Sequence, residues 1–237
     1  MLRTRYSYDR FAWCYESIAR VFSLGAIPRV KASQIAALVP AERVLYVGVG
    51  AGEDALLAAR RGVDLTCLDL SQPMLGRLST RLDSAGLKAR LVRDDILDHT
   101  TDVSYDVVVA NFVLNVFSED TLVVVMQHLA TLLVPGGRLL IADFTPPGRS
   151  PLRHLLYGAY YFPINWIAWA LGLCAMHRIY DYAQYAKVAG LRLVARNPWP
   201  IWSQGWGGEG PRLFESLSFE RPVEGVAAGI SRLGTAG

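Results

Sequence analysis

Short apolar segments alternate with longer amphipathic segments through the middle of the chain, and this alternation constrains the fold more than any other feature. The apolar segments lie at residues 44–47, 65–68, 89–92, 105–110 and 138–142. Segments with helical periodicity follow three of them, at residues 54–60, 73–84 and 121–133. Strands that alternate with helices over short connections form a parallel sheet, and right-handed crossovers place the helices on both faces. We therefore predict an α/β fold with a mostly parallel sheet.

The regular pattern stops after Asp143 and resumes near Tyr182. Outside the central region, the sequence predicts helices at 8–22, 30–38 and 182–189 and strands at 191–196 and 212–219, which brings the strands to seven. The Pro135-Gly136-Gly137 sequence predicts a turn before the fifth strand. We expect residues 1–220 to form one domain with an insert at about 145–180, followed by a flexible tail at 221–237.

A glycine-rich loop joins the first strand to the helix that follows it. Gly48, Gly50 and Gly52 allow the backbone to turn sharply and to approach a ligand near the helix N-terminus. Dinucleotide-binding folds have a similar loop, with the fingerprint GxGxxG. Here Gly52 comes one position too early, and Glu53 would place a carboxylate beside a pyrophosphate. The spacing therefore favours a nucleoside ligand without phosphates.

Carboxylates close the next two strands. Asp69 ends the second strand, where a carboxylate can accept hydrogen bonds from two ribose hydroxyls. Asp94-Asp95 ends the third strand, where a carboxylate can accept from an adenine amino group. A single aspartate at a strand end is more often a helix cap or a turn residue. The glycine loop and the two carboxylates in this order favour a nucleoside site over that explanation.

These residues resemble the motifs of the class I S-adenosylmethionine (SAM)-dependent methyltransferases. The matching segments are 44–52, Asp69, Asp95-Ile96, 105–111 and 134–138. The resemblance covers about residues 40–220. It implies a Rossmann-like sheet of seven mostly parallel strands, N-terminal helices, a helical aromatic lid and SAM as the cofactor.

A looser resemblance points to one group within that superfamily. Three segments are similar to the ubiquinone and menaquinone methyltransferase group. They are Tyr8-Asp9-Arg10-Phe11-Ala12 through Tyr15-Glu16, then Asp143-Phe144, and the aromatic insert. This similarity implies a small, largely apolar acceptor that is aromatic, quinone-like or polyketide-like.

The superfamily resemblance also implies which residues contact the cofactor. The three loop glycines would pass under the methionine part of SAM, Asp69 would hold the ribose diol, and Asp95 would take the adenine amino group. Asn111 and Phe112 would lie beside the sulfonium and the acceptor. The full set implied by the resemblance is Tyr15, Tyr46, Gly48, Gly50, Gly52, Asp69, Leu70, Met74, Asp95, Ile96, Asn111 and Phe112.

Tyr46 is a departure from the family pattern. Most relatives have Asp or Glu at this position, an acid associated with the methionine ammonium group, and a tyrosine carries no charge at neutral pH. Glu53 or Asp54, just past the loop, would compensate. Alternatively, Asp54 caps the helix and Glu53 complements the helix dipole. Both explanations stay open at this point, as does a ligand other than SAM.

The insert at about 145–180 is apolar and aromatic, and residues 155–176 include no charged side chain. Its aromatic residues would line a pocket for a flat apolar acceptor. The stretch is long enough to span a bilayer, but Pro163, Asn165 and the strand that follows argue against a span. Peripheral contact with a membrane stays open, because Tyr and Trp favour membrane interfaces and arginines flank the stretch. The remaining explanation is that the aromatic residues pack a helical cap.

Candidate catalytic residues flank this insert. His154 and His177 would remove a proton from the acceptor, and Tyr180 or Tyr182 would orient it. Each histidine is equally well explained as a surface residue at a helix end. The sequence contains no clustered His/Cys set with metal-ligand spacing, so we expect no metal site.

Composition narrows the function further. The net charge of +3 is spread along the chain, so the sequence has no basic stripe of the kind that nucleic-acid-binding proteins carry. The N-terminal Met1–Tyr6 lacks an apolar secretory region, so we expect a cytoplasmic protein. The leading hypothesis is SAM-dependent methyl transfer to a small apolar acceptor. The alternatives are a SAM-fold enzyme with other chemistry and a non-catalytic SAM-binding protein.

Overall fold

The structure is a computed structural model that describes residues 20, 22–50, 52–149, 151–163, 165–166, 178–202 and 210–223. These residues form a seven-stranded sheet in the order β3-β2-β1-β4-β5-β7-β6. Its strands are β1 (Arg43–Val47), β2 (Asp64–Asp69), β3 (Arg90–Arg93), β4 (Tyr105–Ala110), β5 (Leu133–Phe144), β6 (Arg192–Pro200) and β7 (Arg212–Glu220). Neighbouring strands from β3 to β5 are parallel, and β7 is antiparallel to both of its neighbours. The predicted Rossmann-like α/β fold is confirmed.

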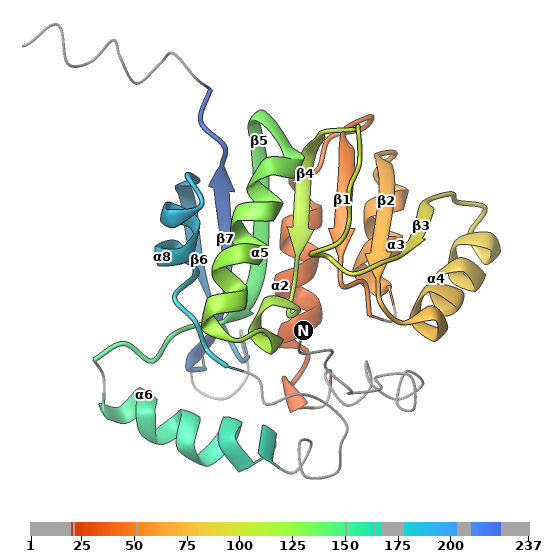
Figure 1. Cartoon of the computed structure of the whole chain (residues 1–237). Helices are drawn as coiled ribbons and strands as arrows, with labels where there is room; N and C mark the ends of the chain where they lie inside the picture. The colour runs from red at the N-terminus through yellow and green to blue at the C-terminus, as the bar shows by residue number, and fades with distance from the viewer. Residues whose placement is uncertain are drawn as a thin grey trace, which may run out of the picture.

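Helices cover both faces of this sheet (Figure 1). One face packs against α5 (Glu119–Leu132) and α8 (Tyr182–Val188), and the other packs against α2 (Ala26–Ile35), α3 (Glu53–Arg60) and α4 (Gln72–Ser84). Successive strand residues point to opposite faces, so Leu45 of β1 packs with the α5 cluster and Tyr46 packs with the α3 and α4 cluster. This double covering explains why the central strands are apolar on both sides.

Two sequence predictions need correction. The helix predicted at 30–38 is α2, which begins at Ala26 because Gly25 has a left-handed φ of 76° and Pro28 fits the first helical turn. The turn predicted at Pro135-Gly136-Gly137 lies inside β5. Gly136 has a φ of 81° there, and the pairing of β4 with β5 shifts register between Tyr105 and Val107. The glycines therefore form a bulge within the strand.

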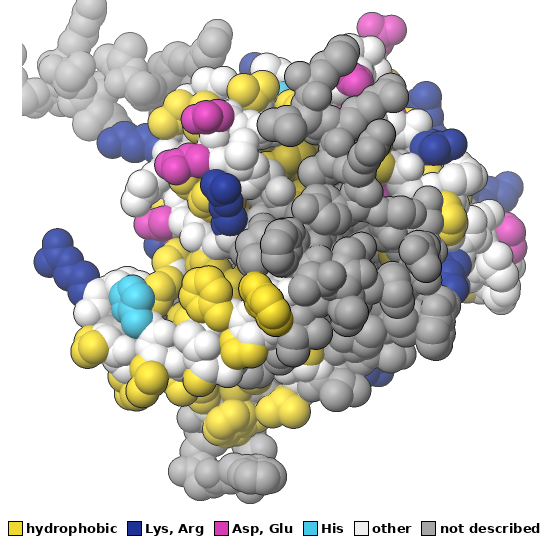
Figure 2. All heavy atoms as spheres, turned by 60° about the horizontal axis from the view of Figure 1, so that its bottom comes forward, with side chains coloured by type: hydrophobic (Ala, Val, Ile, Leu, Met, Phe, Trp, Pro, Cys, Tyr) yellow, Lys and Arg dark blue, Asp and Glu magenta, His cyan; other side chains and the backbone are white. Residues whose placement is uncertain are grey.

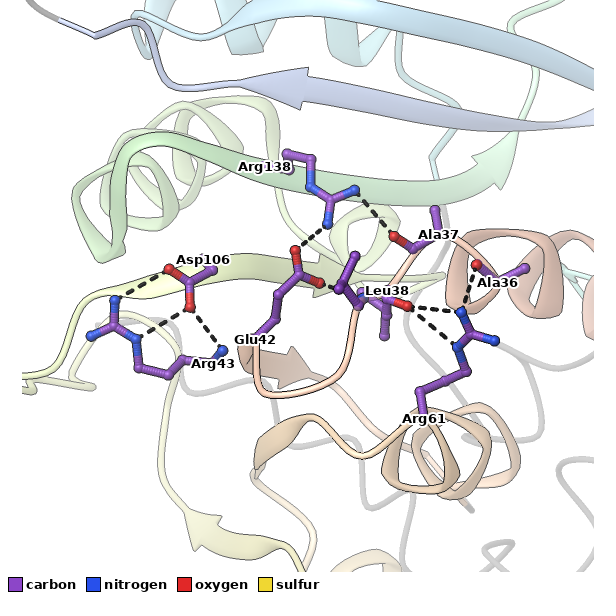
Figure 3. A network of polar contacts seen from close by, with 9 residues as sticks. Ala36, Ala37, Leu38, Glu42, Arg43, Arg61, Asp106 and Arg138 are labelled. Atoms are coloured by element: carbon purple, nitrogen blue, oxygen red, sulfur yellow. Dashed lines mark hydrogen bonds and ion pairs between the residues drawn. The ribbon is translucent and has the colours of Figure 1, made fainter.

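Ion pairs and hydrogen bonds join the elements at the edge of the sheet where β1 begins (Figure 3). Arg43 donates to the Asp106 carboxylate of β4 from its side chain and its backbone, at 2.8 to 3.2 Å, and this contact lowers the pKa of Asp106. Arg138 of β5 donates to Glu42 at 2.7 Å, and Arg61 donates to the Leu38 carbonyl at 3.0 Å. These contacts connect β1 to β4, β5 to the segment before β1, and the end of α3 to the segment after α2.

Beyond the opposite edge, where the parallel strands end, lies a helical segment made of α6 (Pro151–Leu156) and the π-helical η3 (Tyr157–Tyr161) (Figure 1). Tyr157 and Tyr161 pack into a third apolar cluster with Phe144 and Phe214. This is the position predicted for an aromatic lid. No helix among the described residues is both long enough and apolar enough to cross a membrane.

Some predictions concern residues that the structure does not describe. Tyr8, Tyr15 and His177 lie outside the described ranges, as do residues 224–237 of the predicted tail. The predicted division into one domain at 1–220 and a flexible tail at 221–237 stays a prediction.

Candidate active site

The glycine loop lies at the carboxyl end of β1, where the strand order reverses. β1 pairs with β2 on one side and with β4 on the other, and the crevice at such a switch point is where open α/β sheets bind ligands. The loop is held to the neighbouring strand because the Gly48 amide donates to the Leu68 carbonyl at 2.8 Å. The sequence thus places its glycines at the switch point of the sheet, where a ligand crevice is expected in this class of fold.

The three loop glycines have positive φ values but different surroundings. A Cβ on Gly48 would meet the Val113 side chain at 2.5 Å, and one on Gly52 would meet Leu78 at 2.7 Å. A Cβ on Gly50, with φ of 53°, would meet nothing within 4 Å. Gly48 and Gly52 are thus required by packing inside the protein, whereas Gly50 borders open space. The backbone at Gly50 is therefore the part of the loop that a ligand can approach.

Asp69 connects the end of β2 to this loop. One carboxylate oxygen accepts from the Gly50 amide at 3.2 Å, and the other accepts from the Ser71 amide at 2.8 Å. The carboxylate is half-buried, and the neighbouring Leu70 side chain is exposed. Met74 is buried in α4, close to the Ser71 cap that its amide contacts. An acceptor group and an exposed apolar side chain thus lie side by side at the carboxyl end of β2.

A second carboxylate lies after β3. Asp95 accepts from the Leu97 amide at 3.0 Å, and its backbone carbonyl accepts from the His99 amide at 2.9 Å. These bonds form a tight turn, so Asp95 is a turn residue, as the second explanation predicts. Asp95 stays half-buried, whereas the Ile96 side chain is buried in the core.

Tyr46 is fully buried at the end of β1, and its hydroxyl accepts a hydrogen bond from the Asn111 side-chain amide at 2.9 Å. The side-chain oxygen of Asn111 accepts from the Ala142 backbone amide at 2.8 Å. The next residue, Phe112, has a φ of 53°, which is a strained conformation for a bulky side chain. Strained backbone of this kind concentrates at functional sites, where the surrounding structure maintains it.

The acidic residues past the loop have separate partners. Glu53 binds Arg20 through both carboxylate oxygens at 2.8 and 2.9 Å. Asp54 is buried, and its Oδ2 lies 3.4 Å from Lys31 Nζ of α2. Lys31 Nζ in turn lies 5.9 Å from the centre of the Phe112 ring. The helix cap is Gly52 and no side chain bonds there, so the explanation that Asp54 caps the helix is wrong.

Comparisons with known proteins agree with this geometry. A family model described as "Methyltransferase domain" matches residues 44–137. The demethylmenaquinone methyltransferase of Thermus thermophilus is 28% identical over 159 residues, covering 65% of this chain and 71% of the relative. The ubiquinone/menaquinone biosynthesis C-methyltransferase UbiE of Syntrophotalea carbinolica is 30% identical over 163 residues, covering 66% of this chain and 67% of the relative. The chain belongs to the class I SAM-dependent methyltransferases.

Solved structures show the same fold at low sequence identity. The magnesium protoporphyrin IX methyltransferase of Synechocystis, solved with bound SAM, matches with a TM-score of 0.62 and 17% identity. The match covers 92% of each chain. The enzyme uses SAM, and within the superfamily it is of the ubiquinone/menaquinone type.

The residues at the crevice fit SAM as a ligand. Open space over Gly50 leaves room for a ligand against the backbone. The half-buried Asp69 carboxylate can accept from a ribose diol, and the exposed Leu70 offers an apolar surface beside it. Lys31 is positive and Asp54 is negative, and the methionine end of SAM has a carboxylate and an ammonium group that could pair with them.

A buried acidic network lies next to this crevice at the end of β5. The Asp143 carboxylate accepts from Tyr182 at 2.6 Å and from Asn115 and the Phe144 amide at 2.9 and 2.8 Å. Burial raises the pKa of Asp143 to about 7, against the opposing effect of these hydrogen bonds. Glu215 of β7 is also buried, and Arg196 binds both of its oxygens at 3.0 Å.

The predicted catalytic residues have different surroundings. His154 is an exposed residue of α6. Tyr180 is buried against Tyr182 and Tyr185, its hydroxyl donates to the Phe117 carbonyl at 2.8 Å, and burial raises its pKa. His177 lies outside the described residues. Proton removal by either histidine and orientation of the acceptor by Tyr180 stay predictions.

Sequence reasoning did not identify Lys31 as a residue of this site, because it lies in a helix before the glycine motif and nothing in its sequence context distinguishes it from a surface lysine. Tyr182 was predicted as an alternative to Tyr180 for orienting the acceptor, but its bond to Asp143 was not predicted. Both matter because of partners distant in sequence, Asp54 and Asp143 respectively.

Proposed function

We propose that this methyltransferase transfers the SAM methyl group to a small, largely apolar acceptor that is aromatic, quinone-like or polyketide-like. The observation that carries the proposal is the aromatic cluster between the strand ends and the lid. Phe144 contacts Phe112, Phe214 and Tyr161 with ring centres 5.9, 5.0 and 4.7 Å apart. Phe144, Phe214 and Tyr161 are buried, and the half-buried Phe112 would present its ring to a flat apolar acceptor.

Phe112 connects this cluster to the cofactor crevice. It follows Asn111, which bonds to Tyr46 beside the glycine loop, and its ring contacts Phe144 and Phe214 at 5.9 and 6.2 Å between ring centres. An acceptor held against these rings would therefore lie close to the crevice. The names of the two quinone-type relatives support the same class of acceptor.

In this proposal, Asp69 accepts from the ribose diol, Asp95 and the Ile96 amide hold the adenine, and the backbone around Gly50 supports the methionine part. Asp54, with Lys31, replaces the acid that Tyr46 lacks, and binds the methionine ammonium group. Asp54 is preferred over Glu53 because Asp54 is buried, whereas Glu53 is half-buried, with a side chain 41% exposed, and already bound to Arg20.

When bound, SAM supplies an electrophilic methyl group on its sulfonium. The residues of this chain would contribute position and exclusion of water. The aromatic cluster and the lid would hold the acceptor in line with the methyl group. Deprotonation of the acceptor is assigned to no residue here.

The test is product analysis with purified enzyme, SAM and a panel of acceptors that includes hydroquinones, naphthols and polar amines. We expect only apolar aromatic acceptors to gain the mass of one methyl group. A Gly50→Asp variant serves as a control that places a side chain in the open space. Methylation of polar amines alone would contradict the acceptor class, and a product with any other mass change would contradict methyl transfer.

A further inference from the structure

We propose that the outer face of the lid docks on an anionic lipid surface. The lid consists of α6, η3 and the helical residues 162–163 and 165–166, and it has one buried face and one exposed face. Tyr157, Tyr161 and Asn165, spaced four residues apart, are buried against the body of the protein. A helix on the surface of a soluble protein normally presents a polar face to water on its other side.

This helix does not present a polar outer face. Leu152, Leu155, Phe162 and Trp166 are 64, 68, 60 and 59% exposed. Leu152 and Leu155 are three residues apart, and Phe162 and Trp166 are four apart, so each pair lies on one side of a helix. Figure 2 shows hydrophobic side chains gathered over this region of the molecule. Large aromatic and aliphatic side chains held in water in this way indicate an interaction site.

The charges around this face identify the kind of partner. By sequence, residues 145–180 include Arg149, Arg153 and Arg178 and no Asp or Glu. Arg149 and Arg178 are exposed, as is His154. Apolar side chains bordered by cations, with Trp among them, match the combination of acyl chains and anionic headgroups at a membrane surface. Arginines without Asp or Glu in residues 145–180 favour an anionic surface over a partner that presents cations.

The position of the face gives the docking a consequence, which rests on the proposed function. The inner side of the same helix, through Tyr161, forms part of the aromatic cluster proposed to hold the acceptor. Docking would therefore place the lid where an apolar acceptor partitions, so that the acceptor would have a short path from the bilayer to the site.

The experiment is sedimentation of the full chain with vesicles of phosphatidylcholine, with and without phosphatidylglycerol. We expect binding to the anionic vesicles, which weakens as salt is added because the arginine contribution is screened. A Phe162→Ser/Trp166→Ser variant should bind at least about tenfold more weakly, and Arg149→Glu should also weaken binding. Val124→Ser, which changes an exposed apolar residue of α5, is the matched control and should bind as the original protein does.

Circular dichroism and calorimetric SAM binding establish that each variant is folded. Absence of binding to anionic vesicles, or equal binding by the lid variant, would overturn the proposal. A concentration-dependent dimer that the lid variant loses, without vesicle binding, would assign the face to a second copy instead. Because vesicle binding needs no acceptor, failure of methyl transfer would overturn the proposed function and leave the docking proposal standing.

Discussion

The side-chain amide of Asn111 donates a hydrogen bond to the hydroxyl of Tyr46 at 2.9 Å, and both residues are buried. This bond connects the ends of β1 and β4 at the point where the strand order reverses. The family resemblance implies an acid at this position, where Tyr46 has a structural partner instead. In the proposed function, Asp54 supplies the charge for the cofactor.

Replacing Tyr46 with Phe should destabilise the protein without a change in shape at the site. The Asn111 amide would lose its acceptor in a buried position, which costs about 1–3 kcal/mol of unfolding free energy. Urea unfolding measures the loss. In an Asn111→Ala background the same substitution should cost much less, because the amide is already absent. Equal losses in both backgrounds would show that the hydrogen bond does not contribute.

Replacing Asp54 with Asn should weaken SAM binding about tenfold, because a charge-assisted contact to the ammonium group becomes a neutral one. Isothermal titration calorimetry measures the affinity, and thermal unfolding checks that the pairing partner Lys31 tolerates the change. Glu53→Gln is the matched control on the adjacent residue and should bind SAM normally. Asp106→Asn, at the far edge of the sheet, is a second control. A larger effect at Glu53 than at Asp54 would contradict the assignment.

Alanine substitutions at Gly48 and Gly50 should have different consequences. Gly50→Ala adds a methyl group in open space, so its stability cost should be limited to the backbone strain of about 1–2 kcal/mol, while SAM affinity falls at least about tenfold. Gly48→Ala adds the same strain and a clash with Val113, so it should lower the unfolding free energy more. Unfolding and calorimetry on both variants test the contrast. Normal SAM binding by Gly50→Ala would contradict the assignment of the loop.

Stability should decrease as the pH rises from about 4 to about 7. The pKa of Asp143 is raised to about 7 in the folded protein from its ordinary value of 3.8. Over this range the Asp143 carboxyl group is therefore ionised in the unfolded chain and protonated in the folded protein. Each pH unit therefore costs up to about 1.4 kcal/mol from this residue. Well above pH 7 Asp143 is ionised in both states, so its contribution to the unfolding free energy no longer changes.

The Asp143→Asn variant isolates this effect, because an amide does not titrate. Denaturant unfolding of the variant and the original protein across the range should give a flatter dependence for the variant. Replacing Tyr182 with Phe removes one partner of the carboxylate but keeps the titrating group, so the slope should persist. An unchanged slope in Asp143→Asn would assign the dependence to another group.

Much of the fold was predictable from local patterns. The strands at β1, β2 and β4 and the helix α4 match the predicted ranges to within one residue at each end, because apolar runs and helical periodicity report burial directly. Boundaries failed where backbone geometry overrides composition. The helix α2 begins before Pro28, although the sequence predicts a later start. The Pro135-Gly136-Gly137 sequence predicts a turn, but these residues form a bulge inside β5.

The order of motifs along the chain was enough to predict the glycine loop, the carboxylates after β2 and β3, and membership of the methyltransferase family. Those features depend on residues close together in sequence, whose backbone conformation the local chain determines. Only the tertiary structure decided which side chains meet: Tyr46 with Asn111, Lys31 with Asp54, and Asp143 with Tyr182. These partners lie on different strands and helices, and the crossovers of the sheet bring them to one edge. Their ion pairs and hydrogen bonds therefore leave no local pattern in the sequence.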